Sequence, residues 1–325
     1  MNPKLETIAV VGSGTIGASW AALFASRGLN VRMYDVKANA LEAGQRSALA
    51  ALDRLFGNRG ESGESCEGLV SARRRVHTVP LPDEALDGAD FVQESVLERY
   101  PIKREAHELI ERFAPPDAIV ASSSSGLLAH RMQEGLKHPE RFIVAHPFNP
   151  PHLIPLVELV PGPQTSEDVL RATHEFYTSL GKVPVVLRKE IPGHIANRIA
   201  AAVWREAIDL VASGAASIED VDKAIYAGPG LRWSSMGQHM IYHLNGGARG
   251  YEGFFEHFGP QIESWLADMA QWTTIPIEAR CEVLRQMQAS LNGRTQEELE
   301  VWRDDRLQRV LGVLYPQQEH IEQPA

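Results

Sequence analysis

The 325-residue sequence is poor in cysteine and has no long hydrophobic run. Its two cysteines, Cys66 and Cys281, form neither a C-x-x-C pair nor a disulfide framework, so we expect a reducing, cytoplasmic environment. No stretch approaches the ~18 consecutive apolar residues of a membrane helix, and the first residues lack the features of a signal peptide. We therefore predict a soluble protein without a membrane partner.

Basic charge is also in deficit. Lys and Arg number 32 against 42 Asp and Glu, for a formal net charge of -10. Because nucleic acid binding depends on basic surface, we predict no nucleic acid partner, although a local basic pocket for one small anion stays open. We also predict no metal site. With 44% hydrophobic and 23% charged residues the composition is that of a globular protein, and the length suits two domains of about 150 residues each.

Residues 1–190 alternate short apolar runs with amphipathic stretches. The runs predict strands at 7–11, 30–34, 90–94, 118–121, 142–145 and 154–160, with an edge strand at 182–187; helices are predicted at 16–27 and 102–112. This alternation is typical of crossover units. It predicts an α/β domain with a doubly wound, mostly parallel sheet.

Residues 191–315 differ, because apolar residues recur there at helical spacing and β-rich runs are scarce. Helices are expected at 197–211, 218–226, 251–269, 277–287 and 297–314, so a second, all-α domain follows the Pro192-Gly193 hinge. We expect a polar, frayed tail at 316–325 and a mobile loop at 57–68, which is rich in Gly, Ser and Glu.

A Gly-x-Gly-x-x-Gly motif follows the first predicted strand and opens the first helix. Gly12 permits the tight turn, Gly14 admits a pyrophosphate and Gly17 allows close packing of helix on strand. Asp35 ends the second strand, where its carboxylate can bind ribose hydroxyls and repel a ribose phosphate. The pattern predicts a Rossmann-type domain that binds NAD rather than NADP, with the phosphates at the start of the helix and the cofactor-binding residues Gly12, Ser13, Gly14, Thr15, Ile16 and Gly17. A glycine turn with an unrelated surface Asp is the alternative.

Polar residues gather at the expected carboxyl ends of later strands, where open α/β sheets bind ligands. The serines 122–125 follow one strand, His146 follows another, and Asn149 lies three residues further on. Glu158 interrupts an apolar run, where a carboxylate is costly to bury unpaired. A His146–Glu158 pair would orient the imidazole and make it a better base. The alternatives are a structural histidine and an outward-facing Glu158.

Together these motifs resemble the L-3-hydroxyacyl-CoA dehydrogenase family. The resemblance rests on Gly12–Gly17 with Asp35, the serine cluster with Leu127, the His146–Glu158 block and Pro192-Gly193-x-x-x-x-Asn197-Arg198. It extends to about Ala227, or roughly two thirds of the chain. The branch acting on free hydroxy acids, which includes L-gulonate and L-carnitine dehydrogenases, is more similar still, through His146-Pro-Phe-Asn-Pro-Pro and Gly230-Leu-Arg-Trp233.

The resemblance implies roles for individual residues. His146 corresponds to the general base and Glu158 to its orienting carboxylate. Ser125 and Asn197 are similar to the residues that hold the substrate oxygens. Contacts around the nicotinamide ribose and ring are implied for Glu98, Lys103 and Asn149. By itself, Glu98 with Lys103 would be a solvated pair on a helix, and Asn197 a helix cap.

Departures from the acyl-CoA enzymes favour a small free L-3-hydroxy acid, oxidised at its 3-hydroxyl to the 3-keto form. No lysine lies between Lys37 and Lys103 to meet the nucleotide end of CoA, although arginines at 54, 59 and 73–75 are present. Arg232 is the candidate to bind a substrate carboxylate, or else forms an interdomain or subunit salt bridge. Trp233 and the aromatic residues up to Trp265 form either a cage for a trimethylammonium group or ordinary packing.

Two alternatives stay open beside the free hydroxy acid. One is an L-3-hydroxyacyl-CoA dehydrogenase with the same chemistry. The other is a dinucleotide-binding protein without catalysis, against which the joint presence of Ser125, His146, Glu158 and Asn197 argues. The family resemblance also implies a homodimer formed through the helical domain.

Overall fold

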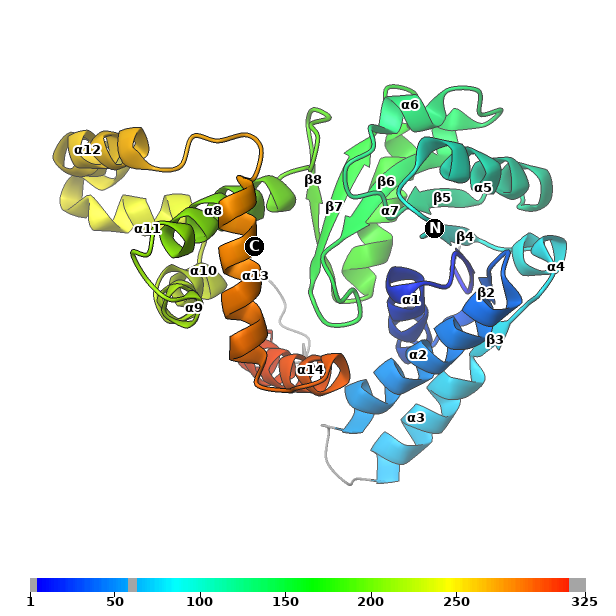
Figure 1. The fold of residues 1–325 in the computed structure, drawn as a ribbon. Helices are drawn as coiled ribbons and strands as arrows, with labels where there is room; N and C mark the ends of the chain where they lie inside the picture. Colours follow the sequence, from blue (N-terminus) through cyan, green and yellow to red (C-terminus); the bar gives the residue numbers. More distant parts are fainter. Residues whose placement is uncertain (1–4, 58–62, 316–325) are drawn as a thin grey trace. The chain divides into compact units, whose positions relative to one another are not determined.

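The structure is a computed structural model that describes residues 5–57 and 63–315. The chain forms two compact units that divide between Asn197 and Arg198 (Figure 1). The sequence placed this division at residue 190. The polar tail predicted at 316–325 lies outside the described residues.

Within the described residues of the first unit, eight strands form one sheet in the order β3-β2-β1-β4-β5-β6-β7-β8. Every neighbouring pair is parallel except β6 and β7, which run antiparallel. The predicted mostly parallel sheet is confirmed, including its edge strand β8. The strands are β1 (Thr7–Val11), β2 (Asn30–Tyr34), β3 (Val76–Thr78), β4 (Phe91–Glu94), β5 (Ile119–Ser122), β6 (Phe142–Pro147), β7 (Leu156–Pro161) and β8 (Val183–Val186).

Helices cover both faces of this sheet because successive strand residues point to opposite sides. From β1, Ile8 and Val10 pack into a core with α1, α2 and α7, whereas Ala9 and Val11 join α4, α5 and α6. The helices are α1 (Thr15–Ser26), α2 (Ala38–Gly57), α3 (Gly63–Arg74), α4 (Pro82–Leu86), α5 (Tyr100–Phe113), α6 (Ala129–Gln133), η1 (Pro139–Arg141) and α7 (Glu167–Ser179).

The prediction of a loop at 57–68 is wrong for residues 63–68, because these residues form the first part of α3. Residues 58–62 of that loop lie outside the described residues. Gly and Ser favour a loop locally, but Leu69 and Ala72 of α3 join the core beside α2. Tertiary packing therefore outweighs local propensity here.

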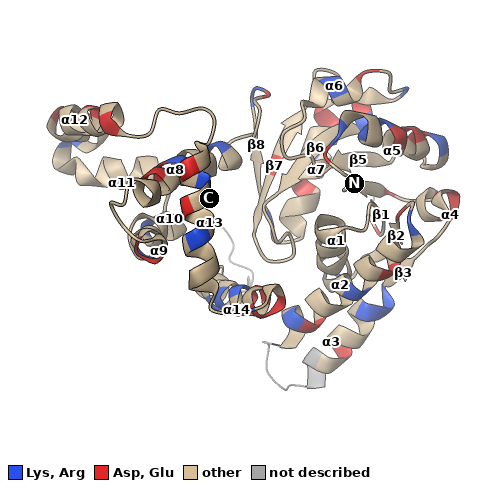
Figure 2. Cartoon of the chain, viewed as in Figure 1, with Lys and Arg blue, Asp and Glu red and all other residues tan. Residues whose placement is uncertain are grey.

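All regular elements described in the second unit are helices, as predicted. Ser217 caps α9, and Thr295 and Glu298 form a capping box at α14. Acidic and basic residues are interspersed along α14, as they are along α5 (Figure 2). The helices are α8 (Ala196–Ala212), which starts in the first unit, α9 (Ile218–Ala227), α10 (Pro229–Ser235), α11 (Gln238–Asn245), η2 (Gly247–Arg249), α12 (Gly250–Asp268), α13 (Ile277–Leu291) and α14 (Gln296–Leu314).

Among the residues described in both units, no helix combines the length and apolar character needed to cross a membrane.

Candidate active site

The glycine loop after β1 has three glycines in three different environments. Gly12 has a φ of +94°, and a Cβ there would lie 2.7 Å from the backbone carbon of Ser95. A Cβ on Gly17 would lie 1.9 Å from the carbonyl oxygen of Gly12, whereas a Cβ on Gly14 would meet nothing within 4 Å. The fold thus requires Gly12 and Gly17, while Gly14 leaves open space over exposed backbone at the start of α1. That space fits the pyrophosphate of a dinucleotide.

Asp35 contacts the same loop from the end of β2. Its carboxylate accepts hydrogen bonds from the backbone N–H of Ser13 at 2.9 Å and from the Ser13 hydroxyl at 3.1 Å. The alternative of an unrelated surface Asp is therefore wrong. Helix α2 backs the loop at Gly44, where a Cβ would lie 2.3 Å from the Ser13 carbonyl oxygen. Thr15 is exposed and Ile16 half-buried at the start of α1.

His146 and Glu158 are directly opposite each other on the antiparallel strands β6 and β7. Opposed residues place their side chains on the same face of a sheet. His146 Nδ1 lies 2.9 Å from Glu158 Oε2, and the two residues are 5% and 1% exposed. Since a carboxylate only accepts, Nδ1 carries a proton, and in the neutral tautomer of the ring the lone pair is therefore on Nε2. His146 lies within β6 rather than after it, because pairing with β7 extends the strand to Pro147.

The other oxygen of Glu158 is bound by the start of α8. Oε1 accepts hydrogen bonds from the backbone N–H of Ile195 at 2.8 Å and of Ala196 at 3.0 Å. Burial alone raises the pKa of Glu158, but the hydrogen bonds from His146, Ala196 and Ile195 lower it below its ordinary value. A helix N-terminus also favours negative charge. Glu158 is therefore an ionised, buried carboxylate, and the outward-facing alternative is wrong.

Ser125 and Asn197 lie next to each other in the first unit. The Asn197 amide donates a hydrogen bond to the carbonyl oxygen of Ser125 at 3.5 Å. Asn197 is the second residue of α8 and so is not its cap. Ser125 is exposed, as is Asn149, which follows the strand that carries His146. Their contacts with substrate and cofactor stay predictions.

Glu98 organises the loop that contains Ser125. Its Oε1 accepts hydrogen bonds from the Ser124 hydroxyl at 2.6 Å and from the backbone N–H groups of Ser125 and Gly126, both at 2.9 Å, and of Leu127 at 3.2 Å. Burial opposes ionisation, but the Ser124 hydrogen bond and the charge of Lys103 lower the pKa of Glu98. Glu98 thus sets the loop geometry from an exposed position at the protein surface.

Lys103 is not the solvated partner of Glu98. It is 1% exposed, and its ammonium binds both carboxylate oxygens of Glu94, at 2.9 and 3.0 Å, while Glu98 lies 3.6 Å away. The predicted direct contact of Lys103 with the cofactor does not fit this burial. Its place is behind Glu98, where it supports the loop.

Sequence reasoning missed Glu94 and His194. Glu94 ends β4, is fully buried, and accepts a hydrogen bond from the Ser122 hydroxyl at 2.6 Å. Burial raises its pKa, but Lys103, His107 and Ser122 outweigh burial and lower the pKa to about 2. Glu94 follows Gln93 at the end of its strand, so it lacks the signal of Glu158, which is a carboxylate inside an apolar run. His194 lies at an unassigned position of the Pro192–Arg198 motif.

Arg232 and Trp233 belong to α10 of the helical unit. Both are exposed, and the Trp233 indole donates a hydrogen bond to the Gln238 side chain. Of the predicted aromatic residues, Tyr242 and Phe254 stack with ring centroids 4.2 Å apart, which joins α11 to α12. This pair is ordinary packing. The substrate contacts of Arg232 and Trp233 stay predictions.

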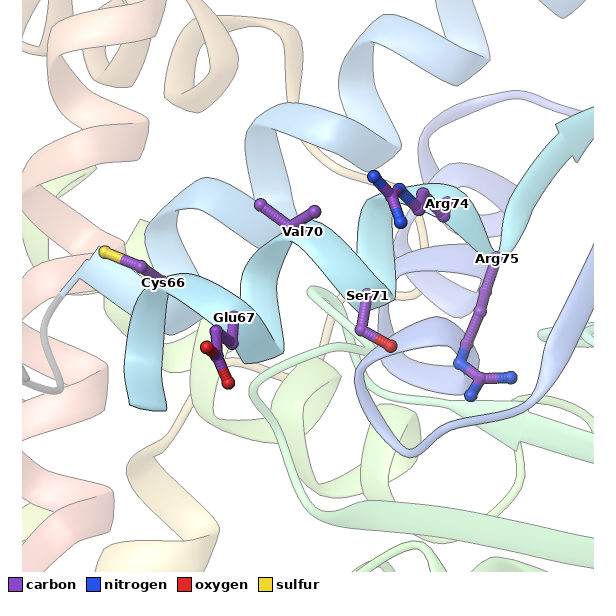
Figure 3. A pocket seen from close by; sticks show the side chains of 6 residues that line it. All are labelled: Cys66, Glu67, Val70, Ser71, Arg74 and Arg75. Atoms are coloured by element: carbon purple, nitrogen blue, oxygen red, sulfur yellow. The ribbon is translucent and has the colours of Figure 1, made fainter. Parts of the chain in front are cut away.

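A hollow over α3 contains none of the predicted site residues. One face of this helix and the residue after it line the hollow, as Figure 3 shows, with Cys66, Glu67, Val70, Ser71, Arg74 and Arg75. In the same segment Arg73 is paired with Asp53 at 2.6 Å. The hollow that Arg74 and Arg75 line therefore shares no lining residue with the surroundings of His146.

Comparison with known proteins agrees with this geometry. Residues 7–191 match the 3-hydroxyacyl-CoA dehydrogenase, NAD binding domain, and residues 193–286 match the C-terminal domain of the same enzymes. The chain is 40% identical over 314 residues to an L-carnitine dehydrogenase of a Pseudomonas species, covering 94% of this chain and 93% of that protein. It is 38% identical to the L-carnitine dehydrogenase of Oceanobacillus iheyensis, covering 95% and 98% of the two chains.

Solved structures are similar over most of the chain. An NAD+-dependent 5-formyl-3-hydroxy-2-methylpyridine 4-carboxylic acid 5-dehydrogenase superposes with a TM-score of 0.79 at 28% identity, covering 97% of this chain and 100% of that one. The (S)-3-hydroxybutyryl-CoA dehydrogenase of Ralstonia eutropha gives a TM-score of 0.64 at 25% identity, covering 90% and 96%. The chain therefore belongs to the 3-hydroxyacyl-CoA dehydrogenase family, as an NAD-dependent dehydrogenase that oxidises the CH–OH group of a 3-hydroxy acid.

Proposed function

We propose that the chain oxidises the 3-hydroxyl of a small, free L-3-hydroxy acid, with L-carnitine as the first candidate and His146 as the general base. The hydrogen bond between His146 and Glu158, 2.9 Å long and buried, carries this proposal. The choice of substrate is supported by relatives named L-carnitine dehydrogenase at 40% and 39% identity over nearly the whole chain. L-Gulonate is the second candidate of the same class.

The proton chemistry follows from the tautomer of His146. Nδ1–H points to Glu158, so Nε2 is the atom that accepts the proton of the substrate hydroxyl. The imidazolium formed in this way is stabilised by the ionised Glu158, whose charge is supported by the N-terminus of α8. Bound NAD supplies the acceptor for the hydride. Ser125 and Asn197 hold the substrate oxygen.

A screen of NADH formation tests the proposal. L-Carnitine, L-gulonate, L-3-hydroxybutyrate and 3-hydroxybutyryl-CoA are compared at equal concentration, with D-carnitine as the control for stereochemistry. We expect a kcat/KM for L-carnitine or L-gulonate at least about tenfold above that for the thioester, and no turnover of D-carnitine. His146→Gln should reduce kcat by at least about 100-fold with the same substrate. Turnover by this variant at the wild-type rate would contradict the assignment of the base.

Oxidation of a 3-hydroxyacyl-CoA is the second candidate. The observation in its favour is the basic segment at α3, where Arg74 and Arg75 line a surface hollow (Figure 3). In this case only the thioester would be turned over efficiently, and it would also raise the unfolding temperature more than the free acids. Arg74→Ala with Arg75→Ala would then increase the KM for the thioester and leave L-carnitine turnover unchanged.

We further propose a cytoplasmic homodimer. Exposed, unbridged Cys66 and Cys281 support a reducing compartment. Large apolar side chains exposed on the helical unit support association through that unit. They include Trp204 (58% exposed), Leu231 (65%), Leu244 (59%), Phe255 (59%) and Trp265 (57%). Sedimentation analysis of the full chain tests the dimer, and a monomer at micromolar concentration would contradict it.

A further inference from the structure

His194 has an unusual backbone and a buried side chain. Its φ is +51°, in the left-handed region that only a few per cent of residues other than glycine adopt, although Asn, Asp and His are the commonest of them. The residue is only 2% exposed. A strained backbone at a buried polar residue persists only when the surroundings enforce it, and such residues cluster at functional sites.

The hydrogen bond of His194 determines its tautomer. Nε2 lies 3.1 Å from the carbonyl oxygen of Ser124, and since a carbonyl only accepts, Nε2 carries the proton. Burial is the largest effect on this imidazole and lowers its pKa, so it stays neutral with a lone pair on Nδ1. That Nδ1 has no hydrogen-bond partner among the described residues. Stability alone does not account for a histidine with a strained backbone and an unpaired nitrogen.

The ring of His194 contacts both His146 and the loop that contains Ser124 and Ser125, which we call the serine loop. Its centroid is 5.2 Å from that of His146, with a 53° angle between the ring planes, while its Nε2 binds the serine loop at Ser124. The next two residues, Ile195 and Ala196, donate their backbone N–H groups to Glu158. This short segment therefore contacts both halves of the site.

Asn197 completes the connection. It donates to the carbonyl oxygen of Ser125, one residue after the carbonyl that His194 binds. Residues 194–197 thus make four consecutive donations, the outer two to the serine loop and the inner two to Glu158. The distance between the serine loop and the His146–Glu158 pair therefore depends on this segment. His194 contributes the buried side chain of the segment.

We propose that His194 is a positioning residue for the reaction, which fixes the loop carrying Ser125 against the His146–Glu158 pair. The inference rests on the proposed function, because it takes His146 as the base and Ser125 as a substrate contact. The donor at Nε2 is the essential feature. A ring without this donor would fill the same space but would lose the hydrogen bond that holds the serine loop at Ser124.

Three substitutions separate the donor from the ring. His194→Gln places an amide N–H near the position of Nε2 and retains the hydrogen bond to Ser124. His194→Asn suits the left-handed backbone, but its amide is too short to reach Ser124. His194→Phe retains an aromatic ring and loses the donor. Each variant is made in the full chain and assayed with the best substrate of the screen, alongside NADH binding and thermal unfolding.

We expect kcat to fall at least about tenfold in His194→Phe and in His194→Asn, with the KM for NAD within about twofold of wild type. His194→Gln should recover kcat to within about threefold of wild type. Equal kcat in all variants, or a kcat of His194→Gln as low as that of His194→Phe, would overturn the inference. If His194→Phe does not fold, the comparison of Asn with Gln decides in the same way.

His146→Gln, assayed in parallel, separates this inference from the proposed function. An inactive His146→Gln together with a fully active His194→Phe would refute only the positioning role. A fully active His146→Gln would refute the proposed base, and the inference with it.

Discussion

Replacing Glu158 by Gln is the most direct perturbation of the proposed mechanism. The change retains the size of the side chain and an oxygen that can accept from Ile195 and Ala196. It removes the negative charge that lies 2.9 Å from His146 Nδ1. The amide N–H group would also face Nδ1 and favour the tautomer whose Nε2 is protonated, which cannot accept the substrate proton.

The size of the effect follows from the geometry. Two unit charges about 4 Å apart at an effective dielectric constant of about 20 attract by about 4 kcal/mol. Because the proton is only partly transferred in the transition state, we take about 2–3 kcal/mol of this attraction as lost. At ~1.4 kcal/mol per tenfold change in rate, kcat falls about 30- to 150-fold from charge alone. The unfavourable tautomer adds to this loss, up to about 10⁴-fold.

Steady-state NADH formation measures the effect. The pKa of Glu158 is lowered below its ordinary value of 4.5, so its charge is present throughout the neutral and alkaline range, and the loss in kcat should not depend on pH there. The KM for NAD should stay within about twofold of wild type. Glu167→Gln is the matched control, since Glu167 is an exposed carboxylate in the first turn of α7. A kcat of Glu158→Gln within about threefold of that control would refute the reasoning.

Further substitutions test the cofactor loop and the buried ion pair. Gly14→Ala should weaken NAD binding at least about tenfold, as titration calorimetry measures, and leave the free energy of unfolding nearly unchanged. Gly17→Ala, whose Cβ would lie 1.9 Å from a carbonyl oxygen, should lower the free energy of unfolding in urea by about 3 kcal/mol. Equal stabilities of the two variants would contradict the distinction. Glu94→Gln leaves Lys103 buried without a counter-ion and should lower the free energy of unfolding in urea by about 3–5 kcal/mol. Because the pKa of Glu94 is lowered to about 2, its contribution is complete above pH 4.5 and is lost as the pH falls towards 2. A difference in unfolding free energy between wild type and Glu94→Gln that stayed constant as the pH fell towards 2 would contradict this prediction.

Much of the site could be predicted because its signals are local in sequence. The glycine spacing with Asp35 and the carboxylate inside an apolar run each have a physical reason that needs no coordinates. Glu94 was missed because it stands at the end of β4, directly after Gln93, and so does not interrupt an apolar run as Glu158 does. The prediction that Lys103 contacts the cofactor was wrong. The ion pair that buries its ammonium joins α5 to Glu94 on β4, and no local sequence pattern indicates such a contact.

The amino-acid sequence by itself determined the alternation of strands and helices, the position of the dinucleotide loop and the residue types available for proton transfer. These depend on periodicity and on the short-range geometry of glycine. Only the tertiary structure decided that His146 and Glu158 face each other, since their strands are antiparallel in an otherwise parallel sheet. The same is true of His194, because its hydrogen bond reaches a carbonyl 70 residues away along the chain. Contacts between distant segments arise from packing, which no local pattern encodes.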